Sequence, residues 1–438
     1  MIIILLGELS VERVILHSDI NSCYASIEHL YHPELHGKPV AVGGNEAERH
    51  GIILAKDDIA KKCGIQTGMT LWEAKRLCPE LTILEPRMKL YYEFTQQVND
   101  IYADYTDLRE PFGLDESWLD LTGCISAKDG EAAAKDIGMR IKNELGVTVS
   151  IGVSWNKPFA KLGSDYKKPD AVTVIDKNRY KDIAWPLPVS DLLYVGRQTT
   201  KKLDIMGIKT IGELAGAPPE ILSKRFGKAG LTIYRYANGL DRSPVRRYDL
   251  KPPPKSIGNS TTTPRDLTNY EEVKVTLTSL VETVAQRLRE QGYLARVLEV
   301  SVRDSKELSW CSRQLKLERY TDITRELLST ALQLFTELHS WPKTIRSIGM
   351  RVSDMIPVGR HEQMDIFFDF EKRDRERELD SAIDRMREKY GYMSIQRGTI
   401  FSDKALGKLN AYEDRIGVFY RGDDQIKNEG MQTGEVQI

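Results

Sequence analysis

Residues 14–24 read VILHSDINSCY, and residues 112–120 read FGLDESWLD. Each stretch joins apolar residues to carboxylates, which are Asp19 in the first and the pair Asp115 and Glu116 in the second. Short apolar runs of this kind favour strands, so we expect these acids at strand ends. Carboxylates that converge on one side of a sheet offer the oxygen ligands that hard divalent cations prefer. The alternative is that each acid is a solvated strand end or a helix cap, and the spacing alone leaves both interpretations open.

The first half of the chain alternates the periodicities of strands and helices. Residues 147–153 alternate apolar and small side chains, which predicts a half-buried strand. Apolar residues recur at every fourth position from 133 to 145, which predicts an amphipathic helix covering a sheet. A further helix is expected over residues 88–105, and a turn at Gly123. Together these patterns predict an α+β sheet with helices on one face.

The second half changes character at about Val189, where short helical segments are separated by glycines. The segment Lys251–Lys255 (KPPPK) predicts a stiff extended linker, and hence a domain boundary. Beyond it we expect a small α+β domain, then a charged helical stretch from Asp369 to Tyr390, and a flexible end after about Asp403. The elements expected in that domain are helices over 272–290 and 323–338 and strands over 297–302, 314–317 and 345–352.

Composition bounds the class of protein. The chain has 438 residues, of which 41% are hydrophobic and 29% charged, so we expect several globular domains and exclude a disordered chain. The apolar run Met1–Leu6 meets Glu8 and is too short to span a bilayer, and it lacks the basic start of a signal peptide. Five cysteines form no CxxC or Cys/His cluster, which argues against structural zinc and favours a cytoplasmic protein.

Charge alone argues mildly against a nucleic-acid partner. The chain has 63 basic and 64 acidic residues, whereas phosphate binding usually brings a basic excess. The distribution is uneven, however. Residues 186–248 contain eleven Lys and Arg against five Asp and Glu, so this segment is the candidate for contact with a polyanion.

A series of motifs, in order along the chain, resembles the Y-family translesion DNA polymerases, and most of all their bacterial DNA polymerase IV group. The resemblance runs from about residue 11 to residue 355 and is too long for a chance match. The motifs that carry it are residues 19–28 (DINSCYASIE), 37–42 (GKPVAV), 114–120 (LDESWLD) and 152–161 (GVSWNKPFAK), with Lys168-Pro169.

The resemblance implies an α+β multidomain fold in the shape of a right hand. The palm has ferredoxin-like topology, the fingers are small, the thumb is a helical helix-hairpin-helix domain, and an α+β little finger follows. The implied domains are the palm (11–22 and 87–180), fingers (23–86), thumb (181–248), linker (249–257), little finger (258–356) and a C-terminal tail (357–438).

The same resemblance assigns the metal-binding acids. Asp19, Asp115 and Glu116 would be the catalytic residues and would hold two Mg²⁺ ions, with the backbone carbonyl of Ile20 as a further ligand. The implied activity is low-fidelity, template-directed addition of dNTPs to a primer 3′-OH during translesion synthesis. One alternative is a non-catalytic accessory relative that binds DNA and the clamp. Another is a palm-type nucleotidyl cyclase, for which a DNA-gripping thumb has no use.

Nucleotide contacts are implied around the first motif. Backbone N–H groups of Ser22 and Cys23 would bind the triphosphate. Tyr24 lies at the steric-gate position, where an aromatic ring blocks a ribose 2′-OH, and its alternative is a core tyrosine. Lys168 matches the lysine that contacts the triphosphate in this family.

The fingers depart from the family pattern in residues 53–65 (ILAKDDIAKKCGI). Asp58 and Lys61 stand where the family often has Tyr and Arg. Lys61 would still meet a phosphate as a point charge, without the bidentate geometry of arginine. Asp58 would repel a triphosphate unless it points away or a neighbouring lysine compensates. Leu54 and Ile52 lie where many relatives carry smaller residues, so their bulk is expected to narrow the range of lesions tolerated.

DNA contacts are implied in the thumb and the little finger. Residues 195–208 resemble a helix-hairpin-helix in which Gly196 precedes a helix N-terminus that binds a phosphate. Tyr194 stands where a first hairpin glycine is common. Lys201 and Lys202 would grip the backbone or, alternatively, form a solvated helix face. The residues expected to meet DNA from the little finger are Arg296, Arg303, Arg313 and Lys316.

A short motif follows the last expected strand. Gln363, Met364, Ile366 and Phe367 resemble the peptide by which bacterial polymerases bind the sliding clamp, a small apolar anchor on a tether. The alternative is a tail strand that packs on its own domain. The partners expected from the whole sequence are primer-template DNA, dNTPs and the clamp, for a monomeric protein.

Overall fold

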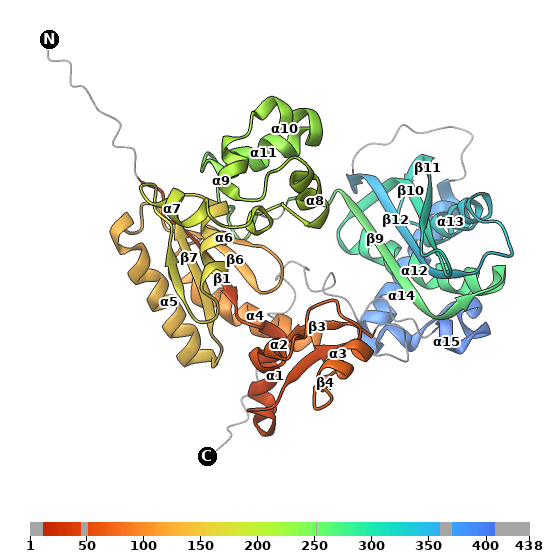
Figure 1. Cartoon of the computed structure of the whole chain (residues 1–438). Coiled ribbons are helices and arrows are strands. Elements are labelled where there is room, and N and C mark those ends of the chain that lie inside the picture. Colours follow the sequence, from red (N-terminus) through yellow and green to blue (C-terminus); the bar gives the residue numbers. More distant parts are fainter. Residues whose placement is uncertain (1–11, 45–50, 251, 360–369, 408–438) are drawn as a thin grey trace, which may run out of the picture. The chain divides into compact units, whose positions relative to one another are not determined.

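The structure is a computed structural model that describes residues 12–44, 51–250, 252–359 and 370–407 (Figure 1). The chain divides into two compact units. Unit 1 comprises residues 1–43 and 53–251, and unit 2 comprises residues 44–52 and 252–438. The division of the chain falls at the start of the proline-rich segment.

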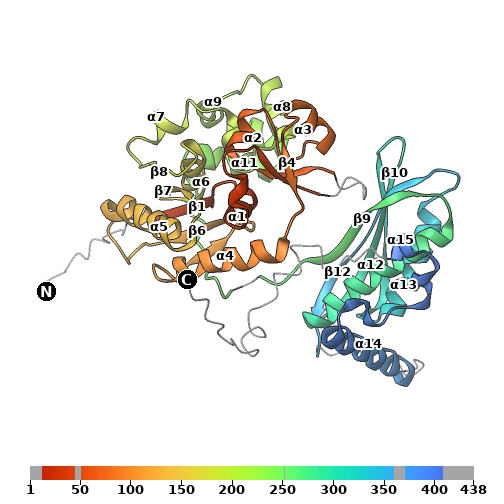
Figure 2. The same ribbon diagram turned by 90° about the horizontal axis from the view of Figure 1, so that it is seen from below.

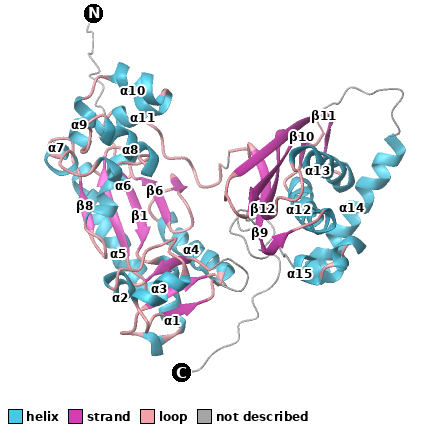
Figure 3. Ribbon diagram, turned by 45° about the vertical axis from the view of Figure 1, so that its right-hand side comes forward, coloured by secondary structure: helices cyan, strands magenta, loops and turns pink. Residues whose placement is uncertain are grey.

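A five-stranded sheet in the order β5-β6-β1-β7-β8 forms the centre of unit 1, and its strands appear as magenta arrows in Figure 3. β1 lies in the middle and is antiparallel to both β6 and β7. The strands expected near residues 14–16 and 147–153 are confirmed as β1 and β7. The strands are β1 (Ile15–Ile20), β5 (Arg109–Pro111), β6 (Glu116–Asp120), β7 (Val149–Ser154) and β8 (Val172–Val174).

Helices cover both faces of this sheet, so the expectation of helices on one face is wrong. α4 (Met88–Ala103) and α5 (Gly130–Leu145) share a core with Leu16 and Ile20 of β1. α6 (Lys157–Tyr166) packs on the opposite face with Ile15. Because side chains alternate along a strand, His17 and Asp19 lie on the face that α6 covers.

The close approach of α6 to the sheet depends on a glycine in β7. A Cβ atom on Gly152 would lie 1.9 Å from the carbonyl oxygen of Ala160 and 2.5 Å from the backbone nitrogen of Ser164. Gly152 is also the β7 partner of His17. The absence of a side chain at this position therefore lets α6 lie directly against β1 and β7.

A second, three-stranded sheet in the order β3-β2-β4 has its own small core within unit 1. Two short helices, α2 (Asp58–Lys62) and α3 (Leu71–Leu77), contribute to that core. α1 (Cys23–Tyr31) instead places Ile27 in the core of the central sheet. The strands are β2 (Val40–Gly43), β3 (Ile53–Lys56) and β4 (Thr82–Leu84).

The rest of unit 1 is helical, as expected from the glycine-separated segments, and has a core of its own. No helix among the described residues of the chain is long and apolar enough to cross a membrane. The helices are α7 (Tyr180–Ala184), α8 (Arg197–Ile205), α9 (Ile211–Gly216), α10 (Pro219–Phe226) and α11 (Lys228–Ala237).

Unit 2 contains an antiparallel sheet in the order β11-β10-β12-β9. Its expected helices and strands are confirmed, although the strands are longer than the patterns predicted. The strands are β9 (Ser256–Leu267), β10 (Tyr293–Asp304), β11 (Trp310–Thr321) and β12 (Ile345–Pro357), and the helices packed on them are α12 (Tyr270–Glu290) and α13 (Thr324–Leu338).

Two C-terminal helices complete unit 2. α14 (Phe370–Tyr390) confirms the expected charged helix, and Figure 2 shows it on the same side of the sheet as α12 and α13. α15 (Lys404–Gly407) places Leu406 in the core of the unit. The expectation of a flexible end after about Asp403 is therefore wrong for residues 404–407, because the buried leucine anchors them.

Candidate active site

Three acids meet at the end of the central strand pair. β1 and β6 are in a register that places Asp19 directly opposite Glu116. The Ile20 N–H donates a hydrogen bond of 3.0 Å to the carbonyl oxygen of Asp115, which fixes Asp115 beside the end of β1. The structure therefore brings together the three acids that the sequence singled out.

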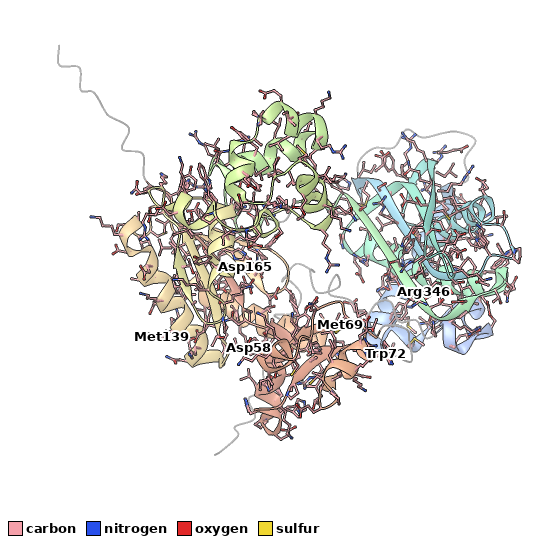
Figure 4. The ribbon with its side chains drawn as sticks, viewed as in Figure 1. Asp58, Met69, Trp72, Met139, Asp165 and Arg346 are labelled. Carbon is pink, nitrogen blue, oxygen red and sulfur yellow. The ribbon has the colours of Figure 1, made fainter. Side chains whose placement is uncertain are left out.

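Two lysines from α6 and the loop after it reach these acids. The Lys161 Nζ lies 2.8 Å from a Glu116 oxygen and 3.3 Å from an Asp19 oxygen. The Lys168 Nζ lies 2.6 Å from the same Asp19 oxygen. Both lysines also contact Asp165, at 3.2 Å and 2.8 Å respectively (Figure 4 labels Asp165). Sequence reasoning gave Lys161 and Asp165 no role, although Lys161 ends one of the quoted motifs.

The three carboxyl groups differ in pKa. Burial, with the charges of Asp19 and Glu116, raises the pKa of Asp115 to about 6. Burial also raises the pKa of Asp19, against the opposing charges of Lys168 and Lys161. The pKa of Glu116 is lowered to about 2, because contacts with His17 and Lys161 more than offset its burial. At Asp115, burial and the charges of the two neighbouring acids outweigh the opposing charge of Lys161.

His17 supports Glu116 from within the sheet. Its ring is fully buried, and burial lowers its pKa, so it is neutral near pH 7. The Nδ1 atom is 2.8 Å from the Ser164 Oγ of α6, and the Nε2 atom is 3.2 Å from a Glu116 oxygen. Trp118 meets the ring edge-on. The role of His17 was not predicted from the sequence, because its contacts depend on the packing of α6.

The donor set fits hard divalent cations, since all three acids offer oxygen ligands and lie within one small region. The side chains are not arranged for a metal, however. Over the described ranges, no group of three or more His, Cys, Asp or Glu side chains is placed to hold a metal ion. The lysine contacts account for this arrangement, because the carboxylates of Asp19 and Glu116 point to ammonium groups.

The N-terminus of α1 lies immediately after β1. Ser22 precedes the helix with φ 47° and ψ 40°, and its side chain does not cap the first N–H groups. Burial raises the pKa of the Cys23 thiol well above its ordinary value, so only its backbone is available to an anion. A helix N-terminus without a side-chain cap favours an anionic ligand, and the contact of Ser22 and Cys23 with a triphosphate stays a prediction.

Tyr24 is held by a chain of contacts that the sequence did not reveal. Its ring stacks on Tyr91 of α4, with centroids 4.5 Å apart and an interplanar angle of 11°. The Tyr91 hydroxyl donates a 2.5 Å hydrogen bond to the buried Glu28, which also accepts from Arg87. The ring of Tyr24 is therefore fixed from one side, which suits a residue that restricts the shape of a ligand.

Asp58 and Lys61 both lie on the short helix α2. Asp57 caps α2 by accepting a hydrogen bond of 2.7 Å from the Ala60 N–H, and Asp58 is exposed at the first helical position (Figure 4). Lys61 is exposed on the same helix. Burial, together with the charge of Lys61, lowers the pKa of Lys56.

The helical part of unit 1 contains the expected hairpin. Gly196 is the N-cap of α8, and a Cβ there would meet nothing within 4 Å. Tyr194 has φ 69°, a conformation that favours glycine, in agreement with the glycine expected there. Lys201 and Lys202 are exposed on α8 without an ion pair to any described residue.

The four basic residues expected to bind DNA from unit 2 are split between two faces of its sheet. Arg313 pairs across the sheet with the buried Val300 and forms an ion pair of 2.8 Å with Glu337 of α13, so it lies on the helix-covered face. Arg303 and Lys316 occupy the other face by register. Strand alternation thus sets Arg313 on a different face from Arg303 and Lys316, and its contact with DNA stays a prediction.

Arg296 and the clamp-binding residues are the remaining predictions on unit 2. Arg296 donates to the Leu317 carbonyl oxygen and lies over the ring of Tyr320. Arg351 was not predicted, but it pairs with Glu299 on the face that carries Arg303, where the alternation of residues 347–353 could have located it. The clamp-binding residues Gln363, Met364, Ile366 and Phe367 lie outside the described residues.

Comparisons with known proteins agree with this geometry. Residues 18–165 match the impB/mucB/samB family, residues 254–366 match the C-terminal domain of that family, and residues 190–241 match a thumb domain described for DNA polymerase-iota. DNA polymerase IV of Acetivibrio thermocellus is 48% identical over 399 residues, which cover 91% of this chain and 100% of that protein. The chain belongs to the impB/mucB/samB family of Y-family DNA polymerases.

Other relatives support the same assignment. DNA polymerase IV of Moorella thermoacetica is 40% identical and DNA polymerase IV 1 of Bacillus subtilis is 36% identical, covering 87% and 88% of this chain and 95% and 92% of those proteins. A solved Y-family DNA polymerase chimera is similar in fold, with a TM-score of 0.70 and 21% identity over 78% of this chain and 99% of that one. As a Y-family member, the chain is a metal-dependent, DNA-directed DNA polymerase, and its fold is the one expected.

Proposed function

We propose that this polymerase performs translesion synthesis with Asp19, Asp115 and Glu116 as its catalytic, metal-binding acids. The observation that carries the proposal is the register of β1 and β6, which sets Asp19 against Glu116 and leaves Asp115 beside them. Two Mg²⁺ ions and the Ile20 carbonyl complete the proposed site. Bound there, the ions would activate the primer 3′-OH and stabilise the pyrophosphate leaving group.

The proposed nucleotide contacts follow from α1 and α6. Backbone N–H groups of Ser22 and Cys23 receive the triphosphate, with Lys168 and Lys61 as cationic partners. Tyr24, fixed against Tyr91, excludes a ribose 2′-OH by its bulk. Leu54 and Ile52 are proposed to narrow the range of lesions accepted.

Backbone contacts are proposed for grip on primer-template DNA. In the thumb they come from Gly196, Lys201 and Lys202, and in the little finger from Arg296, Arg303 and Lys316. Arg351 joins them because its register places it on the face of Arg303. These residues contribute affinity and salt dependence, without reading the base sequence.

The remaining partners are proposed from the sequence alone. Residues 363–367 would bind a sliding clamp, and the polymerase would act as a cytoplasmic monomer. The alternative of a non-catalytic accessory relative is not favoured by the comparisons with DNA polymerases IV.

Primer extension tests the function directly. Undamaged and abasic templates would be compared with Mg²⁺ and with EDTA, for the intact chain and for Asp115→Ala, Glu116→Ala and the surface control Glu93→Ala. We expect metal-dependent extension past the lesion, its loss in both acid variants and its retention in the control. Undiminished synthesis by Asp115→Ala and Glu116→Ala would refute the assignment of the acids. DNA binding without extension by the intact chain would favour the accessory alternative.

A further inference from the structure

We propose that Lys161 is an exchangeable counter-cation of the metal-binding carboxylates. Before metal binds, it holds Asp19 and Glu116 together, and when metal binds, its ammonium group transfers to Asp165. The inference rests on the proposed function, because it takes Asp19 and Glu116 to be metal ligands. Lys161 is then a positioning residue that sets the metal affinity of the site.

The contacts of Lys161 show how one ammonium group serves three carboxylates. Its Nζ lies 2.8 Å from Glu116, 3.3 Å from Asp19 and 3.2 Å from Asp165. The side chain is only 15% exposed. Lys161 of α6 therefore bridges Asp19 of β1 and Glu116 of β6, which are opposite each other in the strand register.

Electrostatics favours a resident cation at this place. Asp19 and Glu116 are both mostly buried, and like charges so close destabilise each other in a region of low dielectric. In the metal-free chain, Lys161 thus offsets the repulsion between Asp19 and Glu116. A divalent cation would do the same with greater charge.

Asp165 is placed to receive the displaced ammonium group. It lies one turn after Lys161 on α6, and its side chain is 43% exposed, so it keeps its charge in contact with solvent. Because Lys161 already touches Asp165, the exchange needs only a rotation of the lysine side chain and no movement of α6. Asp165 also contacts Lys168, so both lysines share this acceptor.

A neighbouring lysine shows the contrast. Lys157, one turn earlier on α6, pairs with the buried Glu110, and that pair contains none of the three acids. Lys167, at the other end of the helix, is exposed and lies over the ring of Tyr166. Lys161 alone among these three lysines contacts the metal-binding acids, and Lys167 provides a control with the same charge.

Manganese binding by the full chain, without DNA or nucleotide, tests the exchange. Free Mn²⁺ would be measured by electron paramagnetic resonance for the intact chain, Lys161→Met and Lys167→Met. Removing the competing cation should tighten Mn²⁺ binding on the order of tenfold in Lys161→Met, with little change in Lys167→Met. Lys161→Arg, which keeps the charge, should bind Mn²⁺ as the intact chain does. Weaker binding by Lys161→Met, or binding equal to that of Lys167→Met, would overturn the inference.

Asp165 supplies a second test with the opposite sign. Without its acceptor, the ammonium group stays on Asp19 and Glu116, so Asp165→Asn should weaken Mn²⁺ binding. In the Lys161→Met background the same substitution should matter less, because Asp165 acts partly through Lys161. Equal effects of Asp165→Asn in both backgrounds would contradict the exchange. Should Lys161→Met fail to fold, Asp165→Asn with Lys161→Arg still decides the matter.

A separate variant distinguishes the inference from the function on which it rests. Asp115→Ala removes an acid that Lys161 does not contact, so it should lose Mn²⁺ binding whether or not the exchange occurs. Unchanged Mn²⁺ binding in Asp115→Ala would refute the proposed metal site. Lost binding in Asp115→Ala with no effect of Lys161→Met would refute the exchange alone.

Discussion

Two of the non-glycine residues with positive φ lie where the polymerase is proposed to touch phosphates. Ser22 has φ 47° directly before α1, and Tyr194 has φ 69° two residues before the N-cap of α8. A non-glycine residue in this region costs on the order of 1 kcal/mol. Both residues directly precede or lie close to a helix N-terminus, which is where the phosphate contacts are proposed.

At the same scale, Gly152 decides whether α6 reaches the acids. We expect Gly152→Ala to push α6 away from β7, since the added Cβ would lie 1.9 Å from a backbone oxygen. The substitution should destabilise unit 1 by at least about 1–3 kcal/mol. It should also tighten Mn²⁺ binding, because Lys161, the competing cation, moves away from Asp19 and Glu116 with the helix. Thermal unfolding and manganese titration would measure the two effects.

Gly138 of α5 is the matched control for this substitution. A Cβ there would lie 3.7 Å from Val149, an ordinary contact, so Gly138→Ala should leave stability unchanged or raise it by up to about 1 kcal/mol. Equal effects of the two substitutions would show that the close approach at Gly152 is unimportant.

The sequence was informative about residues that act through their own chemistry. The three acids and Tyr24 were found from motifs, and the left-handed position of Tyr194 was signalled by the glycine expected there. Lys161, His17 and Tyr91 were missed, because their contacts arise only when α6 and α4 pack on the sheet. The two faces of the little-finger sheet were missed for a related reason, since face assignment requires the strand register.

Elements of unit 1 are joined by an ion-pair cluster at the edge of the central sheet. Glu110 of β5 is mostly buried and accepts from Lys157 of α6 and from the backbone and side chain of Arg246. Burial raises the pKa of Glu110, but the hydrogen bonds from Lys157 and Arg246 more than offset it, so the pKa is lowered. The cluster ties β5 and α6 to the segment that follows α11.

This lowered pKa gives a pH dependence of stability with a definite sign. The stabilisation is present above the unfolded-state pKa of about 4.3 and is lost as pH falls through the lower folded-state value. Glu110→Gln should therefore lower the unfolding midpoint of unit 1 near neutral pH, and the difference from the intact chain should shrink in acid. Thermal scans from about pH 7 down to about pH 2, which pass below the unfolded-state pKa, would measure the difference.

The control for Glu110 is Glu93, whose contact with Lys89 is 3.8 Å long and exposed. Glu93→Gln should change stability by less than about 0.5 kcal/mol at any pH in this range. A difference between Glu110→Gln and the intact chain that is constant with pH would argue against the role of the Glu110 charge.

A second ion-pair cluster, centred on Glu282 of α12, joins elements of unit 2. Its side chain is 3% exposed and accepts from Arg387 of α14 at 2.9 Å and from Arg397 at 2.7 Å. Removing the charge leaves two arginines without their shared partner, so Glu282→Gln should destabilise unit 2 by about 3–5 kcal/mol. It should also speed amide hydrogen exchange in α14, which mass spectrometry would detect.

Glu371 of α14 is the control for the substitution of Glu282. Its side chain is 90% exposed, and its contact with Arg375 is 3.7 Å long. Glu371→Gln should leave exchange in α14 unchanged. If Glu282→Gln behaves in the same way, packing of apolar residues rather than the buried charges holds α14 in place.

At the scale of the whole molecule, each hydrophobic core lies within one unit. The core that includes Leu298 and Leu406 contains only residues of unit 2, and the other cores contain only residues of unit 1. Domains with separate cores unfold separately unless a large interface couples them. We therefore expect two transitions in calorimetry, and a fragment of residues 252–407 should reproduce one of them. A single transition for the full chain, absent from the fragment, would contradict this.

The buried cluster around Glu282 also has a consequence for the order of synthesis. Glu282 leaves the ribosome 105 residues before Arg387 and 115 residues before Arg397. Until those arginines emerge, burying its carboxylate is unfavourable, whereas unit 1 consists only of residues that precede position 252. Unit 1 of the nascent chain is then complete well before unit 2, and a ribosome stalled near residue 360 would carry a folded unit 1 beside an unfinished unit 2.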